Sequence, residues 1–179
     1  MDAATKMHGM DRLKQLIRDV PDFPKPGVLF RDITPLLLDG RKFSRCIDWF
    51  AELLPEIIDY VISIESRGFI FGSALACKLG AGFVPVRKEG KLPHQTYKIS
   101  YKLEYGQAVL EIHKDAMKKG KKCVIIDDVL ATGGTVQAAI KLVKKFGVTI
   151  ESILFLIELK QLGGCERLKD YPIHSLVSY

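Results

Sequence analysis

The sequence predicts an α/β protein whose core is a mainly parallel sheet flanked by helices. Short, almost continuous apolar runs alternate along the chain with longer segments of helical periodicity. Such runs are typical of strands buried on both faces, as in parallel sheets covered by helices. With 179 residues, 47% of them hydrophobic and 27% charged, the chain suits one globular domain with a real core, or a core plus a small appendage. We therefore expect a single domain over residues 1–179.

An amphipathic helix and then an irregular stretch are expected near the N-terminus. Apolar residues recur at the helical i, i+3, i+4, i+7 spacing in Leu13, Leu16, Ile17 and Val20. The helix should end at Pro21, because PDFPKPGVLF (21–30) contains too many prolines for regular structure. The same kind of periodicity predicts a second helix through Phe43, Cys46, Ile47, Phe50 and Leu54.

The middle of the chain should supply two core strands, a helix and a hairpin. YVISI (60–64) and FVPVR (83–87) are apolar enough for buried strands. FIFGSALACKLG (69–80), which lies between them, predicts a helix that ends on glycine. Residues 98–113, KISYKLEYGQAVLEIH, alternate in part around a turn at Gly106. This pattern indicates an antiparallel excursion from the sheet.

A strand, a helix and a further strand should complete the core. CVII (123–126) predicts a buried strand, and SILFLI (152–157) is the last clear core strand. One apolar helix face lies between them, followed by Gly147, and consists of Val136, Ala139, Ile140, Val143 and Phe146. The repeated order of strand, loop and helix is what predicts the parallel sheet.

Composition excludes several classes of protein. The longest apolar stretches, such as Ile153 to Ile157, are far shorter than the roughly 20 residues of a membrane span. The first residues, MDAATKMHGMDRLKQL, carry charges where a signal peptide would be apolar. The four cysteines (46, 77, 123 and 165) have no paired spacing, which argues against a disulfide framework and a zinc site. We expect a cytoplasmic protein that does not associate with a membrane.

The formal net charge of +6 has two interpretations. Lysines on a solvated surface would account for it. The alternative is an attraction for anions, either nucleic acid or a small phosphorylated ligand. Composition alone does not separate the two.

The stretch CVIIDDVLATGGT (123–135) carries the clearest functional pattern. It leads from the carboxyl end of a strand into a helix, and ligands of open α/β sheets bind at such ends. Gly133 and Gly134 let the backbone turn tightly and approach a ligand closely. Exposed N–H groups, the helix N-terminus and the hydroxyls of Thr132 and Thr135 would then bind an anion, namely a phosphate monoester.

The paired acids Asp127 and Asp128 need a different partner, because carboxylates and phosphate repel each other. Hydroxyls, a metal or a protonated nitrogen would serve. A ribose 5-phosphate supplies both halves, a phosphate for the loop and vicinal hydroxyls for the carboxylates. The alternative is that the acids cap the helix and the glycines serve a turn. Other phosphate motifs are absent, because GAGFVP (80–85) lacks the third glycine of a dinucleotide fingerprint and no Gly-Lys-Ser/Thr occurs.

The stretch 123–135 resembles the phosphoribosyl-pyrophosphate (PRPP) motif of the type I phosphoribosyltransferases. The resemblance implies a parallel-sheet core flanked by helices, with a small N-terminal hood and a mobile antiparallel loop. It also implies that Asp127 and Asp128 lie at the ribose hydroxyls. The residues implied around the 5′-phosphate are Ala131, Thr132, Gly133, Gly134 and Thr135.

Three further segments are similar to those of the adenine-using branch of this family. PDFPKPGVLFRDITPLL (21–37) resembles its base-binding hood, and IESRGFIFG (64–72) its pyrophosphate loop. RKEGKLPHQT with YKLEYG (87–106) resembles its catalytic loop, of which about 93–110 would be mobile. The resemblance implies an enzyme of purine salvage that converts adenine and PRPP into AMP and pyrophosphate.

The resemblance also assigns roles to individual residues. The pyrophosphate would be bound by Ser66, Arg67, Arg87, Lys88, Lys91 and Tyr105. Adenine would lie against Leu29, Phe30, Arg31 and Val129. Glu104 is the candidate for proton transfer. Magnesium would arrive bound to PRPP and reach Asp127 and Asp128 through water, without direct protein ligands. A homodimer is expected, in which Arg87 would serve the neighbouring site.

One segment departs from the family, and two other functions stay open. Many members read Leu-Lys-Gly-Arg-Glu-Lys-Leu where this chain has LGGCERL (162–168), so Gly163 and Cys165 replace basic residues. A sister enzyme acting on a 6-oxopurine is the nearer alternative. The other is a PRPP sensor that binds nucleic acid, in which Glu104 would have no evident purpose. We therefore expect small-molecule substrates and no nucleic acid.

Overall fold

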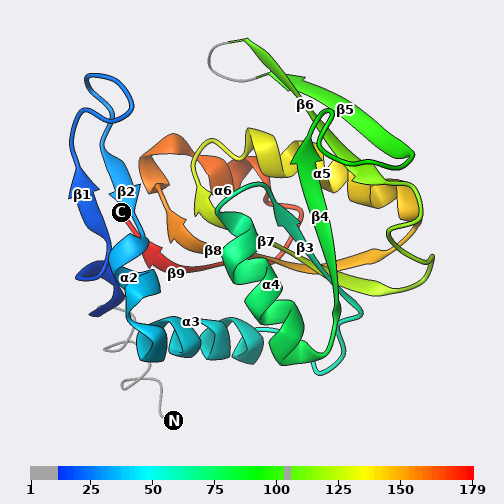
Figure 1. Ribbon diagram of the computed structural model, residues 1–179, viewed down its shortest axis with the longest axis horizontal. Coiled ribbons are helices and arrows are strands. Elements are labelled where there is room, and N and C mark those ends of the chain that lie inside the picture. Colours follow the sequence, from blue (N-terminus) through cyan, green and yellow to red (C-terminus); the bar gives the residue numbers. More distant parts are fainter. Residues whose placement is uncertain (1–11, 103–105) are drawn as a thin grey trace. The chain divides into compact units, whose positions relative to one another are not determined.

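The computed structural model describes residues 12–102 and 106–179 and is shown in Figure 1. These residues fall into two compact units. The first ends at Trp49, and the second runs from Phe50 to Tyr179. Within the described ranges, no helix combines the length and apolarity needed to cross a membrane.

A two-stranded antiparallel sheet and a short helix occupy the first unit, where a longer helix also begins. β1 (Arg18–Val20) pairs with β2 (Phe30–Asp32). α2 (Thr34–Leu38) has a proline in its first turn, where the missing N–H interrupts no helical hydrogen bond. α3 (Gly40–Glu52) confirms the second predicted helix, although the predicted apolar residue Leu54 lies beyond its end.

The first predicted helix is wrong in its extent. Residues 12–14 are helical, but β1 replaces the helix from Arg18 onward. Arg31 pairs with Asp19, and Arg18 Nη1 lies 3.6 Å from Asp32 Oδ2, so ion pairs join the two strands. Ladder pairing and these ion pairs stabilise an extended backbone there, and such contacts override helical periodicity. The proline-rich stretch is irregular as predicted up to residue 29, where β2 follows.

A seven-stranded mixed sheet forms the second unit, with the order β5-β6-β4-β3-β7-β8-β9. The five strands from β4 to β9 in this order are parallel, whereas β6 runs antiparallel to β4 and β5 antiparallel to β6. The strands are β3 (Tyr60–Ile64), β4 (Gly82–Lys88), β5 (Thr96–Lys102), β6 (Gln107–His113), β7 (Lys122–Leu130), β8 (Thr149–Glu158) and β9 (Ile173–Ser178). The predicted α/β class, the parallel core and the antiparallel hairpin are therefore confirmed.

Two strands differ from the prediction. β7 continues through both acids to Leu130, because its pairing with β8 extends to Leu130 opposite Glu158. Asp127 and Asp128 therefore lie inside the strand and not after it. β9 was not predicted, because its sequence, IHSLVS, mixes polar and apolar residues and forms the edge of the sheet.

The helices of the second unit pack against the strands of its sheet. α4 (Gly68–Leu79) packs against β3 and β7, and α5 (Gly134–Val143) packs against the β5–β6 hairpin (Figure 1). Three short helices follow: η1 (Lys144–Phe146), η2 (Lys160–Leu162) and α6 (Gly164–Arg167). The core between sheet and helices is mostly aliphatic, and Ile62, Ile125 and the aromatic Phe155 are fully buried in it. A closely packed core of this kind fixes where the strand ends and helix starts lie.

Candidate functional site

A small hollow lies between the end of β7 and the start of α5. Its volume is about 80 Å³. It is lined by Asp127, Val129, Leu130, Ala131, Thr132, Gly133, Gly134, Thr135 and Val136. The first helical hydrogen bond runs from Gln137 N–H to Gly133 C=O (2.9 Å), so earlier N–H groups have no acceptor inside the helix. All five residues predicted for the 5′-phosphate thus surround one phosphate-sized space at a helix N-terminus.

Close packing supports the loop of residues 131–135, which we call the phosphate loop. Gly133 has φ +75°, a left-handed conformation that glycine adopts without steric cost. A Cβ on Gly164, at the start of α6, would overlap Ala131 O and lie 2.7 Å from Leu130 Cδ1. α6 therefore packs directly on the backbone of the phosphate loop. The sequence does not reveal this contact, because Gly164 and Ala131 are remote from each other in the chain.

The acid pair lies beside the loop and is largely withdrawn from water. Asp128 is 7% exposed, and its Oδ2 lies 2.6 Å from Arg67 Nε. Asp127 Oδ1 accepts a hydrogen bond from Asp128 N–H (2.9 Å). Burial raises the pKa of Asp127, and the neighbouring charge of Asp128 raises it further. Burial also raises the pKa of Asp128, against the opposing effect of Arg67.

The start of α4 touches the same acids. A Cβ on Gly68 would lie 2.6 Å from Asp127 Oδ1 and 3.0 Å from Ser63 Oγ. Glycine at this position therefore lets the first turn of α4 approach the carboxylate closely. The N-terminal end of a helix carries a partial positive charge that favours a nearby anion. Gly68 belongs to the segment 64–72 that resembles a pyrophosphate loop, but the sequence does not reveal this packing role.

A cavity of about 590 Å³ joins these parts. Six of the predicted residues line it: Ser66, Arg67, Lys88, Asp127, Asp128 and Thr135. Its other walls come from Ile64, Glu65, Tyr101, Gln107 and Ala108. The cavity therefore brings cations, acids and the phosphate loop together, which is the arrangement needed for an anionic sugar ligand.

Two predicted cations do not line this cavity. Arg87 is held by its own chain, with Nη2 2.8 Å from Glu65 Oε1 and Nη1 donating to Lys91 C=O (2.9 Å). Hydrogen bonding to Arg87 lowers the pKa of Glu65, so this pair is ionised at neutral pH. Arg87 therefore connects the segment before α4 to the turn that carries Lys91.

A buried carboxylate that the sequence did not single out holds the same turn. Glu111, in β6, is 2% exposed. Its Oε1 accepts hydrogen bonds from the N–H groups of Lys91 and Leu92, both at 2.9 Å, and Oε2 lies 3.3 Å from Thr96 Oγ1. Burial alone would raise the pKa of Glu111, but these hydrogen bonds lower it. The only local signal is one acid within the apolar run AVLEIH.

The residues predicted for adenine are divided between the two units. Leu29, Phe30 and Arg31 lie in or just before β2, whereas Val129 lines the hollow of the phosphate loop. Leu29 is 48% exposed, and the ring of Phe30 meets that of Phe23 edge to face at 5.0 Å. Arg31 pairs with Asp19. The predicted residues Glu104 and Tyr105 lie outside the described residues.

Comparisons with known proteins show the family to which this chain belongs. The family model described as the phosphoribosyl transferase domain matches residues 39–173 of this chain. An adenine phosphoribosyltransferase of Trichormus variabilis is 55% identical over 170 residues, covering 93% of this chain and 99% of that protein. One from Thermotoga neapolitana is 54% identical over 168 residues, with the same coverage of the two chains.

Solved structures give the same picture. The crystal structure of an adenine phosphoribosyltransferase from Thermoanaerobacter pseudethanolicus superposes with a TM-score of 0.91 at 49% identity, covering 95% of this chain and 99% of that one. A Saccharomyces cerevisiae adenine phosphoribosyltransferase, complexed with adenine and an imino-altritol bisphosphate, has a TM-score of 0.90 at 41% identity. The match covers 94% of this chain and 98% of the yeast chain.

Proposed function

The chain belongs to the phosphoribosyl transferase family, and we propose that it transfers the phosphoribosyl group of PRPP to adenine. The products are AMP and pyrophosphate, so the enzyme acts in purine salvage. The observation that carries the proposal is the cavity in which the acid pair, Thr135 of the phosphate loop and the two cations Arg67 and Lys88 meet. The choice of adenine rests on relatives of 53 to 55% identity that are named adenine phosphoribosyltransferases.

The phosphate loop and the acid pair would bind different parts of the sugar phosphate. The N–H groups at the start of α5 and the hydroxyls of Thr132 and Thr135 would hold the 5′-phosphate. Asp127 and Asp128 would accept hydrogen bonds from the two ribose hydroxyls, and bonds to charged acceptors are the stronger kind. The Arg67–Asp128 pair, at 2.6 Å, would fix the orientation of one acceptor before the substrate arrives.

The leaving group is the pyrophosphate at C1 of the ribose. Arg67 and Lys88 line the cavity from the ends of β3 and β4, together with the hydroxyl of Ser66. Their positive charges would stabilise negative charge as it develops on the departing pyrophosphate. Lys91, which precedes the loop of about 93–110, and Tyr105, which lies within it, are proposed to add to this set, and closure of the loop would exclude water.

Magnesium is proposed to enter with PRPP. Among the described residues, no three His, Cys, Asp or Glu side chains form a cluster that could hold a metal ion. Carboxylate oxygens still suit Mg²⁺, which keeps several waters and binds through few protein groups and substrate phosphates. Asp127 and Asp128 therefore fit a role in which they hold the ion through water. When bound, Mg²⁺ would neutralise charge on the pyrophosphate.

Adenine would attack C1 through N9 as the bond to pyrophosphate breaks. Glu104 is proposed to take the proton that N9 loses, a contribution of ~10²–10⁴-fold for a positioned acid or base. The ring of Phe30 is proposed to stack on adenine, and main-chain groups of Leu29 and Arg31 to read its polar edge, while Val129 is proposed as a further adenine-binding residue. A 6-oxopurine would then place an unmatched polar group there, at a cost of ~1–3 kcal/mol.

Assembly and location are part of the proposal. We propose a homodimer in which Arg87 exchanges Glu65 for pyrophosphate in the neighbouring site. A cytoplasmic location agrees with four free cysteines, at positions 46, 77, 123 and 165, because reducing compartments keep thiols unpaired.

The decisive experiment offers adenine, hypoxanthine and guanine separately with PRPP and magnesium. Formation of AMP from adenine, with at most traces of product from the other bases, is the expected result. Turnover of hypoxanthine or guanine alone would assign a sister enzyme. Tight PRPP binding without turnover of any base would indicate a sensor, and salt-dependent binding to DNA or RNA would then be measured.

A further inference from the structure

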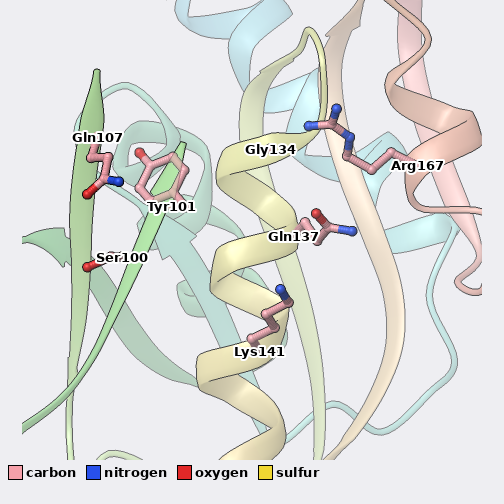
Figure 2. Close-up of a pocket in the computed structure, with 7 residues that line it drawn as sticks. All are labelled: Ser100, Tyr101, Gln107, Gly134, Gln137, Lys141 and Arg167. Atoms are coloured by element: carbon pink, nitrogen blue, oxygen red, sulfur yellow. The ribbon is translucent and has the colours of Figure 1, made fainter. Parts of the chain in front are cut away.

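A second hollow lies beside the phosphate loop, and two of its lining residues, Lys141 and Arg167, have no role in the proposed reaction. It has a volume of about 500 Å³. Its lining is drawn in Figure 2 and comprises Ser100, Tyr101, Gln107, Gly134, Gln137, Lys141 and Arg167. We call it the α5 groove. Its size is that of a site for a small molecule, since such sites are ~300–1,000 Å³.

Three elements build the groove. Gly134, Gln137 and Lys141 follow i, i+3, i+7 spacing, so they form one stripe along α5. Tyr101 and Gln107 line the groove from the β5–β6 hairpin, and Arg167 lines it from α6 (Figure 2). The Arg167 guanidinium lies near the Gly134 end of α5, whereas Lys141 lies further along the helix, with its ammonium directed toward Gln137. The two cations therefore line the same groove at different positions along α5.

The chemistry of the groove is cationic. No residue of its lining is acidic, and its neutral members offer hydroxyl and amide donors. Within residues 12–102 and 106–179, neither Lys141 nor Arg167 forms an ion pair. Other cations of the same unit are neutralised, for example Arg87 by Glu65 and Lys121 by Asp59. Unpaired cations of this kind attract an anion, and a guanidinium matches the oxygens of a phosphate.

We propose that the α5 groove is a second anion site, which takes the phosphate group of a small molecule in addition to PRPP. Arg167 would bind the phosphate by paired N–H groups and Lys141 as a point charge, while Gln137 and the Tyr101 hydroxyl donate further hydrogen bonds. The ligand stays partly hydrated, because Gln137, Lys141 and Arg167 are exposed.

The α5 groove is coupled by shared side chains to the cavity of about 590 Å³ that contains the acid pair, which we call the reaction cavity. Tyr101 and Gln107 line both spaces, and Gly134 lines both the groove and the hollow of the phosphate loop. A phosphate that binds these hairpin side chains competes with the reaction cavity for them. Because binding free energies are reciprocal, PRPP and the groove ligand should weaken each other.

Binding is tested by titration of the full chain with inorganic phosphate and, separately, with CTP. Ribose 5-phosphate is kept at saturation, so that the 5′-phosphate loop is filled. The variant Lys141→Met/Arg167→Met should bind both probes about tenfold more weakly or worse, because two charge-assisted contacts are lost. The matched control Lys160→Met/Lys169→Met removes the same charge outside the groove and should bind like the original protein.

The outcomes separate this site from the proposed function. Ribose 5-phosphate is titrated alone first, so that failure at the phosphate loop is seen independently of the groove. Equal weakening in both variants, or no binding of either probe, would overturn the proposal. Loss of ribose 5-phosphate binding in the groove variant would instead assign the two cations to the loop. Tighter binding of CTP than of phosphate identifies a nucleotide as the ligand, and the reverse identifies free phosphate.

Discussion

At the level of single residues, the buried acid pair illustrates a conflict between stability and function. In the ligand-free protein, burial and Asp128 raise the pKa of Asp127. A carboxyl whose pKa is higher in the folded than in the unfolded state destabilises the fold once it ionises. The function proposed for the pair, acceptance of ribose hydroxyls, nevertheless requires ionised acceptors.

Asp127→Asn should therefore stabilise the ligand-free protein while weakening PRPP binding. The expected gain is about 1 kcal/mol at pH 7, because the amide removes a buried charge and its oxygen can still accept from Asp128 N–H. The gain should disappear as the pH falls below about 3.8, where the aspartate is neutral in both states. Urea unfolding at several pH values measures it, and a loss of stability at neutral pH would contradict the argument.

Asp128→Ala tests the ribose role of the second acid. This change removes one acceptor and leaves Arg67 without the carboxylate that lies 2.6 Å away. Hydrogen bonds to charged groups contribute ~1.5–3 kcal/mol, so PRPP affinity should fall by about tenfold or more. Calorimetric titration with PRPP and magnesium measures the change, and Asp115→Ala, at an exposed acid, is the control. Unchanged PRPP affinity would refute the assignment of Asp128.

At the level of elements, the strands with the clearest sequence signal are those buried on both faces, whereas the β5–β6 hairpin is predicted from its partial alternation. Residues 60–64 form β3 as predicted, because a continuous apolar run is typical of a strand that is buried on both faces of a parallel sheet. β1 escaped prediction because three residues pair with a distant strand against their own helical periodicity. The strand order depends on long-range packing, which no local pattern encodes.

The same distinction applies to the candidate site. Asp127 to Thr135 lie together in the chain, so one motif reveals the hollow. Glu111 and Gly164 act on residues that are remote in sequence, Lys91 and Ala131 respectively. Such positioning residues have no local sequence signal, because they act through contacts with residues that are distant in the chain and do not belong to a motif.

Gly164→Ala should disturb the phosphate loop through α6. The added Cβ would overlap Ala131 O, a backbone atom that cannot rotate away. The loop must shift, so the Michaelis constant for PRPP should rise about tenfold and the protein should lose ~1–3 kcal/mol of stability. Steady-state kinetics and thermal unfolding measure both effects. In Gly163→Ala the Cβ meets nothing within 4 Å, although φ is +65°, so this neighbour should lose stability without a change in PRPP kinetics.

At the level of the whole molecule, the second unit depends on carboxylates that are ionised in the fold. Hydrogen bonding from Arg87 lowers the pKa of Glu65, and the hydrogen bonds from Leu92 and Lys91 outweigh burial to lower that of Glu111. Both side chains join strands and turns that are far apart in sequence, so their protonation loosens the structure around the reaction cavity. Asp127 acts in the opposite direction, because its pKa is raised.

Stability should consequently fall in acid, and Glu111→Gln should flatten that dependence. For a carboxyl whose pKa is lowered by folding, the stabilisation is complete above its unfolded pKa of about 4.5 and disappears as the pH falls through the folded value. At pH 7 the variant should lose ~1–3 kcal/mol, because a neutral amide holds the N–H groups of Lys91 and Leu92 less strongly. Urea unfolding between pH 7 and about pH 3 should then show the two proteins converging in stability. Glu56→Gln, at an exposed site, should leave the pH dependence unchanged. A difference between the original protein and the Glu111→Gln variant that persists undiminished in acid would mean that packing, and not the carboxylate charge, holds the turn.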